Sequence, residues 1–204
     1  ESTLYPSDSN SLANDMIIEI YPDGELIWVG HGGSGGLSCI NKTSGEIKNY
    51  QFESEDAVAI PHEKREALNQ VWDVHRGLEG WLWIATEFGL YKFDPENESF
   101  IRYSFENLDP KKHRTYYENI LDLEPGKLVV ESSAGPLEFN TKTGTFRQLF
   151  QIGQEDHYYF GGDAYAMINQ GVGWFPNHGI TNQGTTSQRN SGIIQYNFSS
   201  QSSI

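Results

Sequence analysis

A unit of about 45 residues recurs along the chain, and the fixed spacing inside this unit limits the folds available. Each copy contains a β-type run that opens with Gly and ends five residues later with Asn or Asp. The four copies are GLSCIN from Gly36, GLYKFD from Gly89, GPLEFN from Gly135 and GIIQYN from Gly192. In the first three copies, the next apolar residue falls six positions after the Asn or Asp, behind a turn with hairpin chemistry. Repeats of this period are typical of solenoids, propellers and arrays.

A second pattern precedes each of these runs. Three segments read apolar, apolar, acid, apolar, and a tight turn and a further β-type run follow each one. They are Ile17–Ile20, Val71–Val74 and Ile120–Leu123, with a weaker copy at Tyr165–Ile168, and the runs after them are centred on Trp28, Trp83, Val129 and Trp174. Because these centres recur at one place, we expect the three tryptophans to lie in the core. Each unit therefore contains four short strands joined by tight turns.

A four-stranded sheet of this length is one blade of a β-propeller. A sandwich also has many short strands, but the fixed period with matched internal spacing favours blades. The sequence predicts an all-β chain of about four antiparallel four-stranded blades, in residues 11–52, 69–105, 116–150 and 164–198. Helical periodicity occurs only across His62–Leu68, which is long enough for about two turns.

The last blade lacks residues for an outer strand, because Ser203 stands where that strand should begin. The sequence also starts at Glu1 without Met, so we expect a piece of a longer protein and a partial ring. An open arc exposes the apolar faces of its first and last sheets, which soluble monomers avoid. We therefore expect further blades or a second copy of the chain to complete the ring, with a closed ring of four blades as the alternative.

The amino-acid composition excludes several classes of partner and of site. Fourteen Lys and Arg against twenty-eight Asp and Glu give a net charge of −14, which argues against nucleic acid and anionic membranes. No apolar run reaches about 18 residues, so this segment is not expected to insert into a membrane. A single cysteine, Cys39, excludes an intrachain disulfide and a zinc cage built from cysteines. Since Cys39 aligns with Lys92, Glu138 and Gln195 of the other repeats, we expect it to be partly exposed.

The segments NSLANDMIIEIYPDGELIWVGHGGSGGLSCINKTSGEIKNYQF and NQVWDVHRGLEGWLWIATEFGLYKFDPENESFIRYSF resemble the two-component-regulator propeller repeat. The third repeat matches moderately, and the fourth matches poorly. The resemblance implies a non-catalytic periplasmic or extracellular sensor region of a bacterial hybrid two-component histidine kinase that responds to glycan fragments. Kinase activity would reside in attached domains, and no cofactor is implied.

Connection lengths predict where a ligand binds. The turns at one end of the predicted blades are short, whereas the longer segments gather at the other end, and insertions on one face often mark the binding face of a repeat protein. These longer segments are His31–Gly35, Glu53–Asn69, Glu106–Thr115, Gln151–Asp163 and Asn177–Ser191. Aromatic rings there can stack on sugar rings while His and Arg bond hydroxyl groups, or the rings can instead cover the apolar end of a blade. The predicted contacts of a small molecule or oligosaccharide are His31, Arg114, Tyr116, Tyr117, His157, Tyr158, Tyr159, His178 and Arg189.

Two other functions stay open at this point. A propeller lyase or hydrolase acting on a glycan or cyclic substrate would use His31, His178 and Glu131, since some lyases on this kind of propeller combine a His, a Glu and a metal. The sequence contains no metal-ligand spacing, so neither a metal nor a catalytic residue is predicted. The third function is a scaffold propeller that binds protein.

Overall fold

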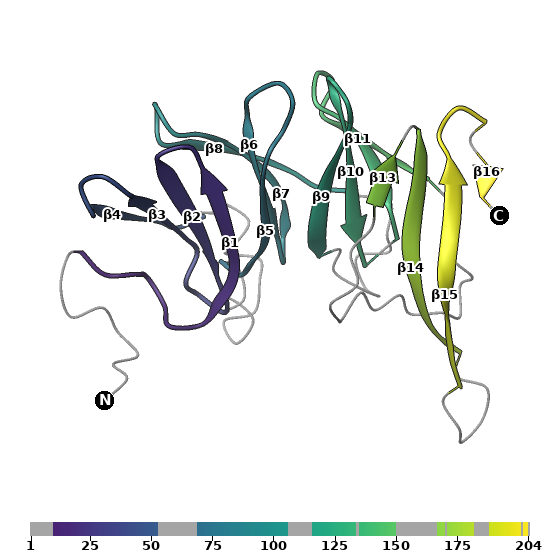
Figure 1. The fold of residues 1–204 in the computed structure, drawn as a ribbon, viewed down its shortest axis with the longest axis horizontal. Coiled ribbons are helices and arrows are strands. Elements are labelled where there is room, and N and C mark those ends of the chain that lie inside the picture. The colour runs from purple at the N-terminus through teal and green to yellow at the C-terminus, as the bar shows by residue number, and fades with distance from the viewer. Residues whose placement is uncertain are drawn as a thin grey trace. The chain divides into compact units, whose positions relative to one another are not determined.

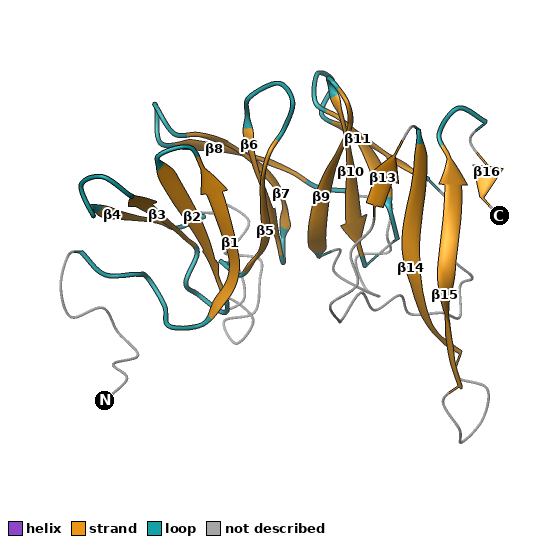
Figure 2. Ribbon diagram, in the orientation of Figure 1, coloured by secondary structure: helices purple, strands orange, loops and turns teal. Residues whose placement is uncertain are grey.

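The computed structural model describes residues 10–52, 69–105, 116–133, 135–149, 167–169, 171–181, 188–200 and 202–203. Within these ranges the chain forms sixteen strands and no helix (Figures 1 and 2). The strands make four antiparallel sheets of four, and in each sheet every strand pairs with its neighbour along the chain. We call these sheets blades 1 to 4 in chain order. The helix considered across 62–68 lies outside the described residues.

The strand bounds show how closely the blades repeat. Blade 1 consists of β1 (Ile17–Asp23), β2 (Leu26–His31), β3 (Leu37–Asn41) and β4 (Ile47–Tyr50). Blade 2 consists of β5 (Val71–Arg76), β6 (Leu82–Thr86), β7 (Gly89–Asp94) and β8 (Ser99–Tyr103). Blade 3 consists of β9 (Tyr117–Glu124), β10 (Lys127–Ser132), β11 (Leu137–Asn140) and β12 (Thr145–Gln148). Blade 4 consists of β13 (Met167–Asn169), β14 (Val172–Thr181), β15 (Gln188–Asn197) and β16 (Ser202–Ser203).

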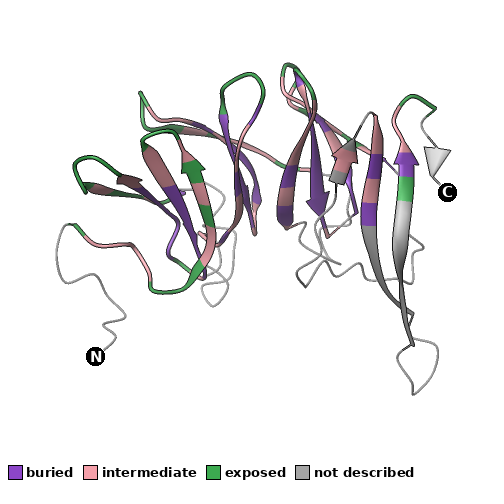
Figure 3. Ribbon diagram, viewed as in Figure 1, coloured by how far each residue is buried: buried purple, intermediate pink, exposed green. Residues whose placement is uncertain are grey.

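The contacts divide the chain into two compact units. Blades 1 and 2 form the first, with bounds Glu1–Arg76 and Gly80–Arg102, and blades 3 and 4 form the second, with bounds Gly77–Glu79 and Tyr103–Ile204. In blades 1 to 3 the second strand is the most buried one (Figure 3). Trp28 and Trp83 lie on these strands and are buried, which confirms their predicted place in the core, whereas Trp174 is half-buried.

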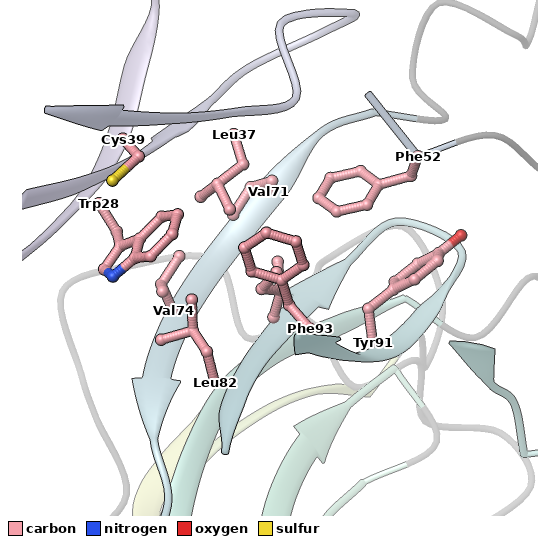
Figure 4. Close-up of a cluster of buried hydrophobic side chains, with 10 residues drawn as sticks. Trp28, Leu37, Cys39, Phe52, Val71, Val74, Leu82, Tyr91 and Phe93 are labelled. Carbon is pink, nitrogen blue, oxygen red and sulfur yellow. The ribbon is translucent and has the colours of Figure 1, made fainter. Parts of the chain in front are cut away.

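Blades 1 and 2 pack face to face. We call the face of a blade that packs on the next blade its trailing face, and the opposite face its leading face. The trailing face of blade 1 contributes Trp28, Leu37, Cys39 and Phe52, and the leading face of blade 2 contributes Val71, Val74, Leu82, Ile84, Tyr91 and Phe93 (Figure 4). Burial of each such large apolar side chain stabilises the fold by roughly 1.5 to 3 kcal/mol. Cys39 is therefore buried, and the prediction that it is partly exposed was wrong.

Aromatic rings fill this interface because few other large side chains are available. The Phe93 ring stacks on Phe100 at 4.4 Å between centroids, and it meets Trp28 edge to face at 5.6 Å. Close approach of the blades also requires a glycine, since a Cβ on Gly30 would lie 2.7 Å from Cγ1 of Val71. In the second unit, Phe175 and Tyr196 of blade 4 pack on Val129 and Leu149 in the same manner.

Strand register corrects one predicted alignment. Ile20 pairs with Val29 in blade 1, Val74 pairs with Ile84 in blade 2, and Ile120 pairs with Val130 in blade 3. The counterpart of Ile17–Ile20 in blade 3 is thus residues 117–120, three positions before the predicted Ile120–Leu123. The error arose because β9 is eight residues long and its apolar residues, at 117, 120, 121 and 123, allow more than one alignment with the motif. Only the pairing of β9 with β10 fixes the register.

Blade 4 differs from the expectation in two ways. Residues 177–191, predicted as a long loop, are mostly strand, since β14 and β15 pair from Val172 with Asn197 through Thr181 with Gln188. The prediction was wrong because this stretch is polar and shows no apolar alternation, while its backbone still continues the ladder. In addition, the two residues of β16 pair with β15, so the start of a fourth strand is present.

Candidate functional site at the loop ends of the blades

Each blade has two different ends. At one end, short turns join the first strand to the second and the third to the fourth, as in the two-residue turn between Asp23 and Leu26. The opposite end carries the remaining connections, and we call it the loop end. Most residues of the predicted long segments 53–69, 106–115 and 151–163 lie outside the described residues. The described part of the loop end consists of the strand termini and the connections from the second strand to the third.

A buried hydroxyl group closes this connection in blades 2 and 3. Thr86 Oγ1 donates a hydrogen bond to the Gly89 carbonyl at 2.9 Å and accepts one from the Gly89 amide at 3.1 Å. Ser132 Oγ likewise donates to the Gly135 carbonyl at 2.7 Å. Opposite each of these side chains the first strand contains a β-bulge, and blade 1 has its bulge at the same place. Bulges of this kind often lie beside functional sites.

In blade 1, His31 takes the place of this hydroxyl. The connection that follows is two residues longer, and the His31 amide bonds the Gly36 carbonyl at 3.0 Å. The His31 Nε2 atom lies 2.7 Å from Ser38 Oγ, which donates to Asn49 Oδ1 at 2.6 Å. Ser38 Oγ therefore accepts a hydrogen bond from the protonated Nε2 atom of His31, and this tautomer is inferred from the network. The Ala13 amide also donates to Ser38 Oγ, at 3.3 Å, so the network fixes the segment that leads into β1.

Burial shapes the electrostatics of His31. Its Nδ1 atom is buried and has no partner in hydrogen-bonding geometry. Loss of solvation lowers the pKa of the imidazole, although the nearby carbonyl groups of Met16 and Asn14 oppose this shift. The neutral ring is thus favoured, and its described partners belong to the fold of blade 1. In this structure His31 is fully buried.

The loop end of blade 3 buries two carboxyl side chains. Glu118 on β9 and Glu131 on β10 are 8% and 0% exposed, and they are the only buried acidic residues of the described ranges. Asn119 Nδ2 donates to Glu131 Oε2 at 2.5 Å. Burial of a carboxylate is costly without compensating partners, so such groups are candidates for function. Glu131 was considered from the sequence, but Glu118 was missed because a single Glu next to Tyr117 gives no signal in an amphipathic strand.

Two further acids occupy equivalent positions on the first strands of blades 1 and 2. Glu19 and Asp73 are each the third residue of the repeated motif, and their counterpart in blade 3 is Asn119. Burial raises the pKa of Glu19, and the charge of Asp73 raises it further. These acids add to the negative potential of the first unit. Within the described residues, no cluster of three or more His, Cys, Asp or Glu side chains has a geometry suited to a metal ion.

The residues predicted to contact a ligand do not share one environment in the structure. Tyr117 is buried in the core of blade 3, where its hydroxyl accepts a hydrogen bond from the Phe105 amide at 2.7 Å. Tyr116 is half-buried, and its amide donates to Ser133 Oγ at 3.2 Å. His178 and Arg189 lie on the β14–β15 hairpin, where they pair with Ser191 and Ile180. Arg114, His157, Tyr158 and Tyr159 lie outside the described residues, and the set of contacts stays a prediction.

Comparison with solved structures identifies the fold. The extracellular domain of BT3049 from B. thetaiotaomicron, assigned to the hybrid two-component systems, is 17% identical and superposes with a TM-score of 0.64 over 97% of this chain. The extracellular domain of BT4673 from the same organism is 12% identical, with a TM-score of 0.65 over 93% of this chain. PorZ, a surface component of the type-IX secretion system of Porphyromonas gingivalis, is 13% identical, with a TM-score of 0.61 over 94%.

This chain spans 24%, 22% and 26% of the lengths of those three structures, respectively. No protein-family model and no curated protein matches the sequence. In the ranges that the structure describes, no helix has the length and apolar character needed to cross a membrane. The structural similarities, together with four antiparallel meanders of equal design, confirm the predicted fold: the chain is all-β and is built from β-propeller blades.

Proposed function

We propose that this chain is a non-catalytic ligand-sensing propeller, the extracytoplasmic sensor part of a two-component signalling receptor, and that its ligand is a glycan or a similar small molecule. The observation that carries the proposal is the similarity of nearly the whole chain to the extracellular domains of BT3049 and BT4673. A fold by itself hosts many functions, so the site must supply the rest. The chain spans about a quarter of the length of those structures. Its connection to a signalling output is therefore proposed together with the sensing role.

The chemistry of the loop ends supports a sugar ligand. At the loop end of blade 3, the half-buried Asn119 side chain donates a hydrogen bond to the buried carboxylate of Glu131, which fixes both groups. The sequence adds Tyr158 and Tyr159, and aromatic rings beside a few fixed polar groups are typical of small-molecule sites. Binding would shift the balance between two receptor states only if the ligand prefers one of them.

Titration calorimetry with a panel of neutral and acidic oligosaccharides tests the proposal. We expect one class to bind, and we expect binding to weaken at least about tenfold, or 1.4 kcal/mol, when Tyr158 and Tyr159 are both changed to Ala. Trp81→Ala is the matched control, because Trp81 is a partly exposed aromatic residue at the opposite end of blade 2 and should leave affinity unchanged. Absence of heat with every glycan, or equal loss in the control, would contradict the proposal.

The two buried carboxyl groups favour a second candidate, a glycan hydrolase or lyase. Glycoside hydrolysis commonly uses a pair of carboxyl groups with different protonation states, and Glu118 and Glu131 are neighbours across the β9–β10 ladder. The same panel decides between the two functions when the products are analysed by chromatography. Turnover that Glu131→Gln abolishes while binding persists would establish the enzyme. Binding without turnover in the unmodified chain would leave the sensor.

A further inference from the structure

A short segment crosses the leading face of blade 1 before the chain enters β1. We call this segment, residues 10–16, the strap (Figure 1). At the outer strand β4, Asn10 Oδ1 accepts a hydrogen bond from the Ile47 amide at 2.8 Å. The Asn49 side chain on the same strand donates to the Ser11 carbonyl at 2.9 Å. Side-chain amide groups therefore fix the first half of the strap to the outer edge of the blade.

The second half of the strap is fixed nearer the loop end. The Ala13 amide donates to Ser38 Oγ at 3.3 Å, and the Gly32 amide donates to the Met16 carbonyl at 2.9 Å. Ser38 pairs with Val29 across β3 and β2, and these two residues of the leading face are 0% and 2% exposed. Residues 10–16 do not form a strand, so separate hydrogen bonds hold the strap in place of a continuous ladder.

His31 lies where the strap, β2 and β3 meet. Its Nε2 atom donates to Ser38 Oγ at 2.7 Å, which is the same oxygen that accepts the bond from the strap, and His31 is fully buried. Gly35 approaches the ring so closely that a Cβ there would lie 2.3 Å from the His31 Cβ and 2.7 Å from the Asn14 Cβ. The imidazole is thus enclosed between the strap and the connection after β2, and water reaches it only when the strap moves.

A positive charge on this ring would lack a counter-ion within the described residues. Because Nε2 already donates, a second proton must bind Nδ1, which is buried without a partner in hydrogen-bonding geometry. Asp15 of the strap is exposed to solvent. The titratable side chains of the adjacent strands lie on the trailing face of blade 1 and are Glu19, Tyr21, Asp23, Cys39, Lys48 and Tyr50. The pKa of His31 is lowered by burial and raised, to a smaller extent, by carbonyl groups of the strap, with no charged side chain among the causes.

We propose that His31 is a proton-sensitive latch for the strap: protonation of the ring releases residues 10–16 from the leading face of blade 1, and deprotonation returns them. A charged ring gains hydration when the strap lifts, whereas the neutral ring keeps its bond to Ser38. The open form therefore binds the proton more tightly, and a fall in pH shifts the population toward it. This response belongs to one face of blade 1 and does not depend on the ligand proposed above.

Amide hydrogen exchange of the full chain, followed by NMR and corrected for intrinsic exchange rates, tests the proposal. The Ala13 and Gly32 amides report on the strap. The Gly89 amide, which donates to Thr86 Oγ1 in blade 2, reports on the rest of the first unit. Between a pH of about 7.5 and about 5.5, the protection of the strap amides should fall at least about threefold, with about tenfold as the limit for one proton. The protection of Gly89 should not change.

Three variants separate the latch from other titrating groups. His31→Gln keeps a side-chain N–H donor but cannot titrate, so the protection of the strap should become independent of pH. His75→Gln is the matched control, because His75 lies on β5 and packs edge to face against Tyr21 at 6.3 Å, so the pH dependence should persist. Asn10→Ala removes the anchor at the outer edge and should lower the protection of the strap at every pH, with the pH dependence retained.

The unmodified chain decides the matter even where His31→Gln does not fold. The NMR signal of the His31 ring must titrate with the same midpoint as the loss of strap protection. Constant protection through that midpoint would overturn the proposal, and so would a rise, which would mean that the charged ring binds the strap carbonyls. Equal loss of protection at Gly89 would also overturn it, because the whole unit would then open. A pH dependence that persists in His31→Gln would do the same.

Discussion

Asp23 links blades 1 and 2 through one carboxyl group that serves several donors. Its Oδ1 and Oδ2 atoms each accept from Arg76 Nε at 3.0 Å, Arg76 Nη2 donates to Oδ2, and Trp28 Nε1 donates to Oδ2 at 3.1 Å. The side chains of Arg76 and Asp23 are only 30% and 18% exposed, so solvent screens this pair less than an ion pair at the surface. We predict that Asp23→Asn, which keeps the shape and removes the charge, separates the electrostatic contribution from packing.

The magnitude follows from the number of bonds and their exposure. A hydrogen bond to a charged group contributes about 1.5 to 3 kcal/mol, and partial exposure reduces this, so we expect Asp23→Asn to lower the free energy of unfolding by about 1.5 kcal/mol. With an m-value of about 2 kcal/mol/M, the urea midpoint should fall by about 0.75 M. Glu98→Gln is the control, because the ion pair between Glu98 and Lys48 is exposed to solvent and should contribute nothing measurable to the free energy of unfolding.

The dependence on pH provides a second test. The hydrogen bond from Arg76 lowers the pKa of Asp23, burial opposes the shift, and Trp28 adds to it. A lowered pKa means that the carboxylate stabilises the fold above the unfolded value of about 3.9, and this stabilisation is lost as the pH falls through the folded pKa. The difference between the unmodified chain and Asp23→Asn should therefore shrink below a pH of about 3.9. An unchanged midpoint at neutral pH, or a difference that persists in acid, would refute this reasoning.

Three further predictions concern other buried groups. Phe93→Ala should lower the free energy of unfolding by about 3 to 5 kcal/mol in urea denaturation, whereas Ile101→Ala should change it by less than about 0.5 kcal/mol, and equal effects would contradict the interface described above. Burial raises the pKa of Cys39 to about 11, with a smaller contribution from the charge of Asp23. The thiol should therefore react with a disulfide reagent at pH 8 only at the rate of unfolding, and fast labelling would disprove its burial. Because burial lowers the pKa of His31, the unfolded chain binds more protons, so stability should decline as the pH falls below about 6.5, and His31→Gln should remove that decline in thermal melts.

The strands could be predicted from the sequence because the residues at the strand ends of each blade are characteristic of turns. The Gly and Asn or Asp positions mark strand ends, as at Gly89 and Asp94 of β7, and these signals do not depend on distant contacts. The apolar pattern of β9 did not fix its register, because residues 117–120 and 120–123 both fit the motif and only the pairing with β10 distinguishes them. The hairpin through residues 177–191 was missed for a related reason, because backbone pairing there continues without an apolar pattern.

Less of the candidate site followed from the sequence. His31 was expected in a loop but ends β2 and is buried, because a Gly-rich segment after it allows the chain to turn while the imidazole meets Ser38. The burial of Tyr117 in the core of blade 3 did not follow from the sequence, because it depends on the register of β9 against β10. Long connections and aromatic residues indicate one end of a blade from the sequence alone. The bulges in the first strands decide which side chains point into the core. A bulge of one residue has no signature in this sequence.

The order of strands within each sheet has a consequence for how the chain acquires its structure. Every strand pairs only with its sequence neighbours, so each meander closes through short loops, and few residues separate partners such as Trp28 and Cys39. Short loops close at small entropic cost, and local pairing is associated with fast folding even in β-proteins. Blades should therefore nucleate independently and acquire full stability as neighbours stack, which is the behaviour of quasi-one-dimensional repeat proteins. In pulsed hydrogen exchange, the backbone amides of the blades would then gain protection in an order set by how well the faces of neighbouring blades pack. The position of a blade along the chain would not set this order.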